Sequence, residues 1–293
     1  MSAGSHRLRA TFWLLDAPDS LRAQSHHNPD GTGLGTYDEH DRPVVDKQPL
    51  SAFHDPEFAR AARHVTSTTF VAHVRFASTG AHTYENTHPF ELDGRLFAHN
   101  GVIGDLPKLE AHLGDDRDLV KGDTDSERLF ALITRETRAR DGDVRAGIVA
   151  AMRWVARELP VFAANIVLTT DRELYALRYP DTHDLYLLER SNDGPLHHRS
   201  HLGTHVHSEH AAELPVVVVA TEHMDDDPAW SDLASGELVV VNDRLEITRS
   251  RVIEHPPAHP LTLADLDEHA RASQAGGPPA PGATSSASSS PPS

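Results

Sequence analysis

Residues 69–127 constrain the fold most strongly, because apolar runs there end repeatedly in polar or small residues. Between residues 70 and 76 the apolar side chains alternate as in a half-buried strand, with His73 and Arg75 sharing one face. Residues 96–98 form a second apolar run that leads into a His-Asn-Gly triplet. Functional side chains are often delivered where a rigid strand ends, so the pattern predicts a site at these strand ends.

Composition excludes several classes of function. The chain has 293 residues and a formal net charge of −17, with 27 Lys and Arg against 44 Asp and Glu, which argues against binding to nucleic acid or to anionic membranes. It contains no cysteine, so this sequence has no disulfide, no thiolate nucleophile and no cysteine metal site. No apolar run reaches the roughly 20 residues of a membrane span, and we expect a soluble, cytoplasmic protein.

Helix signals occur before, within and after this central stretch. Residues 16–25 suit a helix start, and residues 55–64 are rich in Ala, Arg and Phe. Thr124 and Glu127 have the spacing of a capping box, in which the two side chains would satisfy each other's backbone amides. A further helix is predicted over residues 143–158.

Strands are predicted on both sides of these helices. Residues 42–50 suggest a short strand and loop, and the glycine-rich residues 28–35 a structural loop, since their spacing is not that of a dinucleotide-binding motif. Later runs separated by short turns suggest an antiparallel meander over residues 163–170, 173–178 and 184–189. Further strands are predicted at 216–221, 237–241 and 245–248.

These elements predict one layered α+β domain over residues 1–271, with helices packed on stacked sheets. Residues 272–293 are almost entirely Ser, Pro, Gly and Ala, so we expect a disordered tail.

Histidine is abundant, with 22 residues in the chain, several of them between residues 197 and 210. Their spacing matches neither a helix face nor a zinc motif, which favours a solvated polar loop over the alternative of a metal site. His73 and His99 lie on predicted strands and are interpreted as hydrogen-bonded core groups. No metal and no cofactor is predicted.

Four motifs occur in order along the central stretch: AHVRFASTG at 72–80, ENTHPFE at 85–91, LFAHNGVI at 96–103 and GDTDSE at 122–127. Together they closely resemble the class II glutamine amidotransferases, which are N-terminal-nucleophile hydrolases. The similarity is nearest to stand-alone members such as the γ-glutamyl hydrolase of ergothioneine biosynthesis. The resemblance implies a four-layer αββα sandwich and hydrolysis of glutamine or a γ-glutamyl amide, with release of ammonia or an amine.

The resemblance also implies roles for individual residues. The Asn100 side chain and the Gly101 backbone amide would form an oxyanion hole. Arg75 would bind the substrate α-carboxylate through a planar guanidinium, and Asp125 would hold the substrate ammonium. The pocket lining, or the loops around it, would include two more residues, Ser78 and His88. A surface ion pair for Arg75 and a helix-dipole role for Asp125 are the structural alternatives.

The beginning of the chain departs from the family pattern. Family members begin Met-Cys-Arg, and the cysteine attacks the amide while its own amino group accepts the proton. This chain begins MSAGSHRLRATF, and Ser2 is too close to the following segment to substitute. We expect the natural start to lie about six residues upstream and the chain as written to be inactive. The alternative is a non-catalytic protein that binds a glutamyl ligand or acts as a scaffold. No synthase domain is fused, so an ammonia-accepting synthase would be a separate chain.

Overall fold

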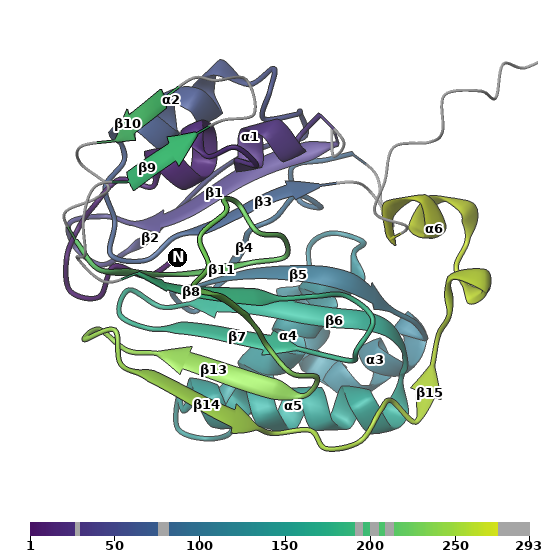
Figure 1. Ribbon diagram of the computed structural model, residues 1–293. Helices are drawn as coiled ribbons and strands as arrows, with labels where there is room; N and C mark the ends of the chain where they lie inside the picture. The colour runs from purple at the N-terminus through teal and green to yellow at the C-terminus, as the bar shows by residue number, and fades with distance from the viewer. Residues whose placement is uncertain (27–29, 76–81, 191–195, 200–204, 209–213, 275–293) are drawn as a thin grey trace, which may run out of the picture.

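The computed structural model describes residues 1–26, 30–75, 82–190, 196–199, 205–208 and 214–274. It has four layers, helix, sheet, sheet and helix (Figure 1). The predicted α+β fold with a four-layer αββα sandwich is therefore confirmed.

The lower helical layer contains α3 (Leu106–Leu113), α4 (Asp125–Arg138) and α5 (Val144–Glu158). It covers a seven-stranded sheet in the order β14-β13-β7-β6-β5-β4, with β15 paired to β6. The strands of this sheet are β4 (Phe90–Leu92), β5 (Arg95–Ile103), β6 (Pro160–Thr169), β7 (Leu174–Arg178), β13 (Glu237–Val241), β14 (Ile247–Arg251) and β15 (His259–Pro260). The largest apolar cluster lies between these helices and the sheet, including the stacked rings of Phe97 and Phe130.

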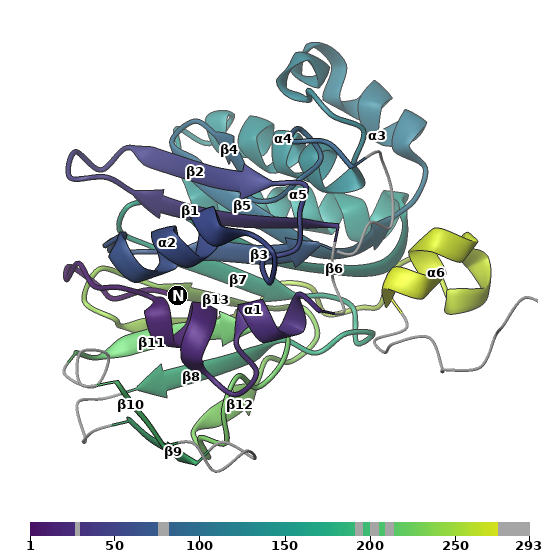
Figure 2. The same ribbon diagram turned by 90° about the horizontal axis from the view of Figure 1, so that it is seen from above.

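The second sheet layer consists of two three-stranded sheets, β2-β1-β3 and β11-β8-β12. Their strands are β1 (Gly31–Tyr37), β2 (Pro43–Gln48), β3 (Val71–Arg75), β8 (Tyr186–Arg190), β11 (Val216–Ala220) and β12 (Trp230–Asp232). Above them lie α1 (Leu21–Gln24), α2 (Pro56–His64) and the π-helical turn Phe12–Asp16 (Figure 2). A further 3-10 turn, Gly114–Leu119, follows α3.

The first residues of the chain join these two sheets. Ser2 exchanges backbone hydrogen bonds with Val217 of β11, at 2.8 and 2.9 Å, and pairs with Thr69 just before β3. The Ala3 amide donates to the Thr68 carbonyl at 2.8 Å. This short N-terminal segment therefore occupies the strand position between β3 and β11.

Gly31, Gly33 and Gly35 lie on a buried central strand, β1, so the expected glycine loop over residues 28–35 is wrong for this part. These glycines share one face of the strand. A Cβ at Gly33 would lie 2.0 Å from the His88 carbonyl oxygen, and one at Gly35 would lie 2.9 Å from Leu96. Glycine is needed because the two sheets approach each other this closely.

Polar side chains cap the first turns of α2 and α4. The Asp55 side chain accepts hydrogen bonds from two amides at the start of α2, and the Thr124 hydroxyl accepts from the Glu127 amide at the start of α4. The reciprocal half of the predicted capping box does not form. The Glu127 carboxylate instead accepts from the amides of Lys121 and Gly122, so it holds the preceding turn.

Two strand predictions need correction. Residues 186–190 do not continue the β6–β7 meander, because β8 pairs with β11 and β12 in the other sheet layer. Within the expected histidine loop, β9 (Leu196–Arg199) and β10 (His205–Ser208) pair as antiparallel strands. Their sequences did not show the strand pattern, because they are rich in polar residues, which are uncommon in strands with one buried apolar face.

The chain after β15 stays near the first residues of β6. It forms a 3-10 turn, Leu263–Asp265, and then α6 (Glu268–Gln274), which extends three residues into the predicted tail. Leu266 and Ala270 pack against Val102, Phe162 and Ala163 of β5 and β6. The remaining tail residues, 275–293, lie outside the described part of the chain.

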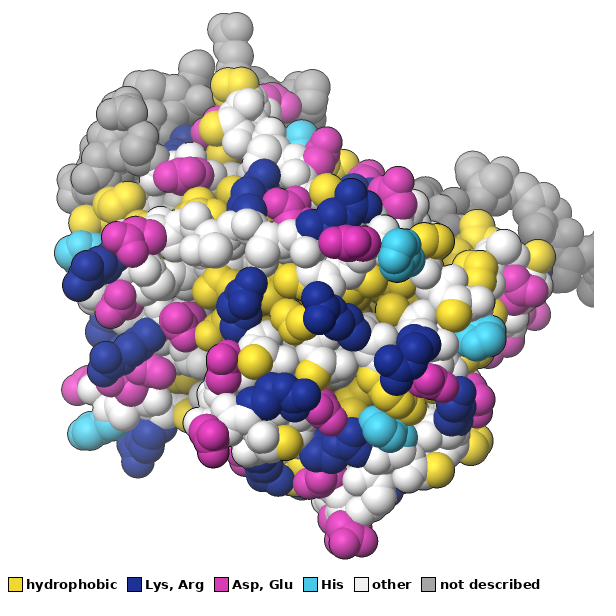
Figure 3. Space-filling view, turned by 90° about the horizontal axis from the view of Figure 1, so that it is seen from below, with side chains coloured by type: hydrophobic (Ala, Val, Ile, Leu, Met, Phe, Trp, Pro, Cys, Tyr) yellow, Lys and Arg dark blue, Asp and Glu magenta, His cyan; other side chains and the backbone are white. Residues whose placement is uncertain are grey.

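The outer face of the lower helices carries interspersed acidic and basic side chains (Figure 3). Examples are the ion pairs of Arg138 with Asp93 at 2.7 Å and Arg140 with Glu136 at 2.6 Å. Within the described residues, no helix combines the length and the apolar character needed to cross a membrane.

Candidate active site

A cavity of about 800 Å³ opens between the two sheet layers. Five of the predicted site residues line it: Arg75, His88, Asn100, Gly101 and Asp125. Ser78, the sixth, lies outside the described residues. The structure therefore brings together side chains from β3, β5, the segment before β4 and the start of α4.

Asn100 and Gly101 lie within β5, where they pair with Asn165 and Ala164 of β6. The predicted strand was expected to end before this pair, but it continues to Ile103 and shifts register between Val102 and Ile103. Gly101 has φ of +151°, and a Cβ there would lie 1.9 Å from the Ala163 carbonyl oxygen. Only glycine allows this close approach of the two strands beside the cavity.

Arg75 is the last residue of β3, and its side chain is 4 % exposed. Burial lowers the pKa of its guanidinium from the usual value, while the nearby carboxylates of Asp30 and Asp125 act in the opposite direction. A guanidinium keeps its charge under these conditions. The end of β3 therefore delivers a buried positive charge to the cavity.

His73 and His88 stack on each other with ring centroids 4.3 Å apart. Burial lowers the pKa of His73 to about 4 and that of His88 well below its usual value, so both rings are neutral at pH 7. Both ring nitrogens of His88 and Nδ1 of His73 are buried without a hydrogen-bond partner among the described residues. Such groups are rare in proteins and are typical of ligand-binding sites.

The Asp125 carboxylate is held by two backbone amides, one from β5 and one from α4. Its Oδ2 accepts a hydrogen bond from the Ile103 amide at 2.9 Å, and its Oδ1 accepts from the Ser126 amide at 2.9 Å. The Ser126 hydroxyl lies 2.9 Å from Nδ1 of His99, whose pKa is lowered by burial. The start of α4 is thus tied to both ends of the Asn100–Gly101 segment of β5.

Lys47 supports the loop that carries His88. Its Nζ donates to the carbonyl oxygens of Thr87 at 2.7 Å and Pro89 at 3.3 Å, and burial lowers its pKa to about 8. On the other side, the Asn86 side-chain oxygen accepts from the Asp123 amide at 2.8 Å. These bonds fix the loop relative to β2 and the turn before α4.

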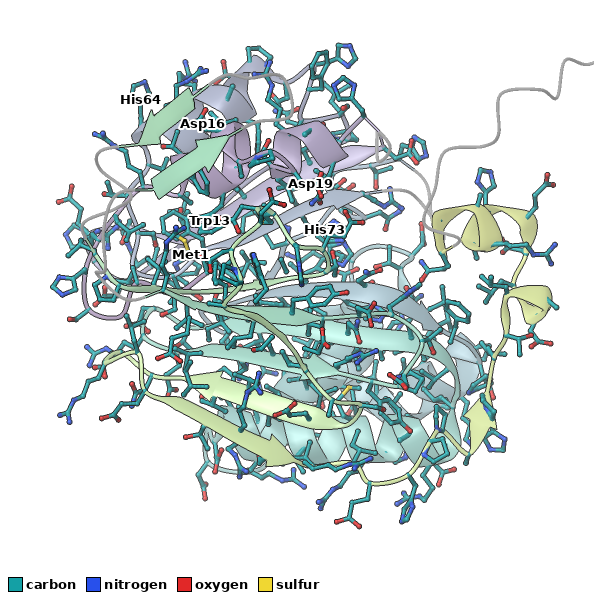
Figure 4. All side chains as sticks on the ribbon, in the orientation of Figure 1. Met1, Trp13, Asp16, Asp19, His64 and His73 are labelled. Atoms are coloured by element: carbon teal, nitrogen blue, oxygen red, sulfur yellow. The ribbon has the colours of Figure 1, made fainter. Side chains whose placement is uncertain are left out.

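Met1 also lines the cavity (Figure 4). Its amino group donates to the Phe70 carbonyl oxygen at 2.9 Å, and burial lowers the pKa of this amine from 8.0 to about 5. The amino group therefore lies beside the start of β3, the strand that also contains His73 and Arg75.

The profile of the class-II glutamine amidotransferases matches residues 15–261, which is most of the chain. The chain belongs to this family. It is 28% identical over 242 residues to the γ-glutamyl-hercynylcysteine sulfoxide hydrolase of Mycolicibacterium smegmatis, covering 78% of this chain and 89% of that protein.

Of two other similarities, the first is to a protein of no stated function and the second supports the fold. An uncharacterized protein of Methanocaldococcus jannaschii is 27% identical over 235 residues; the match covers 76% of this chain but only 63% of that protein's length. A glutamine aminotransferase class-II domain protein from Silicibacter pomeroyi superimposes with a TM-score of 0.53 at 22% identity, covering 77% of this chain and 92% of that one.

Sequence reasoning missed several residues at the site of this class-II glutamine amidotransferase. His73 and His99 were assigned to the core; His99 has the expected hydrogen bonds, but both residues line the cavity. Asn165 had no motif around it, although a buried asparagine within an apolar strand could have marked it. It accepts a hydrogen bond from the Tyr179 amide and donates to the carbonyl oxygens of His183 and Asp184.

Proposed function

We propose that this class-II glutamine amidotransferase hydrolyses the side-chain amide of glutamine or of a γ-glutamyl compound, releasing ammonia or an amine. The observation that carries the proposal is the convergence of Arg75, Asn100, Gly101 and Asp125 on one cavity. These residues provide the anion site, the oxyanion donors and the carboxylate that such a substrate requires.

The Asn100 side-chain amide and the Gly101 backbone N–H stabilise the negative oxygen that forms when the substrate carbonyl is attacked. Loss of one such donor typically lowers the rate by about 100-fold to 1000-fold. The strand pairing between β5 and β6 holds both residues in place before substrate arrives. The donors therefore require little reorganisation during the reaction.

Arg75 and Asp125 bind the amino-acid end of the substrate. The Arg75 guanidinium pairs with the α-carboxylate in a bidentate geometry, which is strong in a buried site. Asp125 accepts two backbone hydrogen bonds, and an ionised carboxylate has about four acceptor positions, so it can also accept from the substrate ammonium. The pair selects a substrate with both charges of an α-amino acid.

The attacking group in this proposal is a cysteine in a segment upstream of Met1. Two observations support it. Met1 and Ser2 run between β3 and β11, so a segment continuing in the same direction would pair along β3 toward Arg75. In addition, the lowered pKa of the Met1 amine shows that burying it as an ammonium is costly. If a residue preceded Met1, this nitrogen would be an uncharged peptide amide and the cost would disappear. The 293-residue chain by itself is then inactive.

A paired assay tests the function. The 293-residue chain and a form extended to the upstream Met-Cys start are incubated with glutamine and with a γ-glutamyl amide. We expect release of ammonia or amine only from the extended form, and no release after its cysteine is changed to alanine. Upstream DNA without an in-frame cysteine codon, or a silent extended form, would contradict the proposal.

The absence of cysteine from the 293 residues favours a second candidate, a glutamyl-binding protein without catalysis. In that case both forms are silent, while glutamate raises the melting temperature and Arg75→Lys removes the effect. A separate ammonia-accepting synthase is the partner in a third arrangement. It is distinguished by ammonia release that increases when that synthase and its acceptor are added.

A further inference from the structure

The final described segment, residues 262–274, lies beyond the part of the chain that matches the family profile, which ends at residue 261. It nevertheless contributes Ala272, Ser273 and Gln274 to the lining of the active-site cavity. Figures 1 and 2 both show α6 beside the ends of the central strands, apart from the other helices. This part of the cavity wall is therefore supplied from outside the matched region.

The segment is held firmly in this position. Leu266 and Ala270 pack against Val102, Phe162 and Ala163, directly behind the Gly101 contact. Within the segment, the Arg271 guanidinium donates to three backbone carbonyl oxygens, those of Leu263, Ala264 and Leu266. The Thr262 amide and hydroxyl both donate to the Asp265 carboxylate, at 2.8 and 2.6 Å. The wall is thus a packed structural element.

Two hydrogen bonds and one strand pairing connect α6 with Asn100 of β5. The Gln274 side chain is only 9 % exposed, and its Oε1 lies 2.8 Å from Nε2 of His183. The His183 carbonyl oxygen accepts from the Asn165 side chain at 3.2 Å. Asn165 is the register partner of Asn100. The helix is therefore linked by named contacts to the residue that faces the scissile carbonyl in the proposed reaction.

Exposure distinguishes the two ends of the cavity. Arg75 and Asp125, at the amino-acid end, are 4 % and 2 % exposed. Ala272 is exposed, as are Thr221, Glu222 and His223, which also line the cavity. In the proposed function the glutamyl group binds beside the buried Arg75 and Asp125, so the leaving amine extends toward the exposed lining residues. The side chains at the exposed end therefore meet the amine portion of the substrate.

We propose that residues 262–274 are a specificity element that contacts the amine portion of a γ-glutamyl amide larger than glutamine, an inference that rests on the proposed function. The Ser273 hydroxyl donates to the Ala270 carbonyl oxygen at 2.9 Å and accepts from Gln274 Nε2 at 3.0 Å. A hydroxyl oxygen has a second acceptor position and an amide nitrogen a second proton, and these are offered to a polar amine portion. Glutamine, whose leaving group is ammonia, does not reach them. The element therefore affects large amides and leaves glutamine unaffected.

The test introduces a bulky side chain at the wall. Ala272→Trp narrows the exposed end, and Ala264→Trp is the control, because Ala264 is exposed in the same segment but does not line the cavity. Gln274→Ala removes the polar contact without adding volume. Each variant is made in the 293-residue chain for calorimetric binding and in the extended form for turnover. The ligands are glutamine and the γ-glutamyl amide of diaminobutane.

We expect Ala272→Trp to weaken binding of the diaminobutane amide roughly tenfold or more relative to glutamine. Gln274→Ala should weaken it roughly threefold to tenfold, and Ala264→Trp should change neither ligand. Equal effects of Ala272→Trp on both ligands, or on neither, overturn the inference, and so does a wild-type chain that fails to bind the larger amide. Failure of the extended wild type to hydrolyse either compound overturns the proposed function instead, and the binding ratios still decide the role of the segment.

Discussion

Gly101→Ala should destabilise the protein strongly, because two separate costs fall on one residue. The added Cβ would lie 1.9 Å from the Ala163 carbonyl oxygen, whereas an ordinary contact spans 3.4–4 Å, so β5 and β6 would have to separate by at least 1.5 Å locally. Overpacking of this kind costs about 1–3 kcal/mol. The φ of +151° adds about 1–3 kcal/mol of backbone strain for a residue with a side chain. We expect a loss of roughly 2–6 kcal/mol in the free energy of unfolding.

Urea denaturation followed by far-ultraviolet circular dichroism measures this loss. Gly94→Ala is the matched control, because Gly94 has φ of +76° and no heavy atom within 4 Å of the added Cβ. Its cost should be only the strain of a left-handed residue, about 1–2 kcal/mol. A Gly101→Ala variant no less stable than Gly94→Ala would show that the close approach of the two strands does not constrain this position.

Three further predictions concern the anion site, the amino terminus and a helix cap. Arg75→Lys should raise the KM for a γ-glutamyl amide roughly tenfold in the extended form, since a lysine cannot bind a carboxylate bidentately. The control is Arg95→Lys, which should leave the KM unchanged because Arg95 is buried outside the cavity. Acidification from pH 8 to pH 5 should destabilise the 293-residue chain by about 3 kcal/mol more with a free than with an acetylated Met1 amine, measured by denaturation of both forms. The sign follows because the amine has a pKa of 8.0 when unfolded and about 5 when folded, so the unfolded state binds the proton first. Asp55→Ala should lower the unfolding free energy by about 1 kcal/mol through loss of the α2 cap, without changing ligand binding.

Local signals in the sequence were sufficient for many elements and for the motif residues. Alternation predicted β3, and the end of α5 followed from its helical periodicity. The cap at Thr124 depends on a residue three positions away, so it is visible in a short window. The four ordered motifs also predicted the family, which the profile match confirms.

Other features depend on residues that are distant in the sequence. The glycines of β1 resemble a loop until β1 is seen to pack against residues 88–96, more than 50 positions away. The partner of β8 is β11, beyond the histidine-rich segment, so adjacency along the chain gave the wrong meander. Helix α6 follows a polar sequence, and only its contact with Val102 and Phe162 explains why it ends next to the cavity. Propensity cannot predict contacts of this kind.

The histidines show how the physical setting changes the interpretation of one residue type. His99 finds partners in Ser126 and the Ala163 carbonyl, as a core histidine should. His88 is equally buried but has neither ring nitrogen paired among the described residues, and His73 stacks on it with one nitrogen unpaired. Leaving such groups unsatisfied costs about 1–3 kcal/mol each, a cost that a bound polar substrate would offset. Ligand binding should therefore stabilise this cavity more than its apolar area alone predicts, and His88→Phe should reduce the gain in melting temperature produced by glutamate.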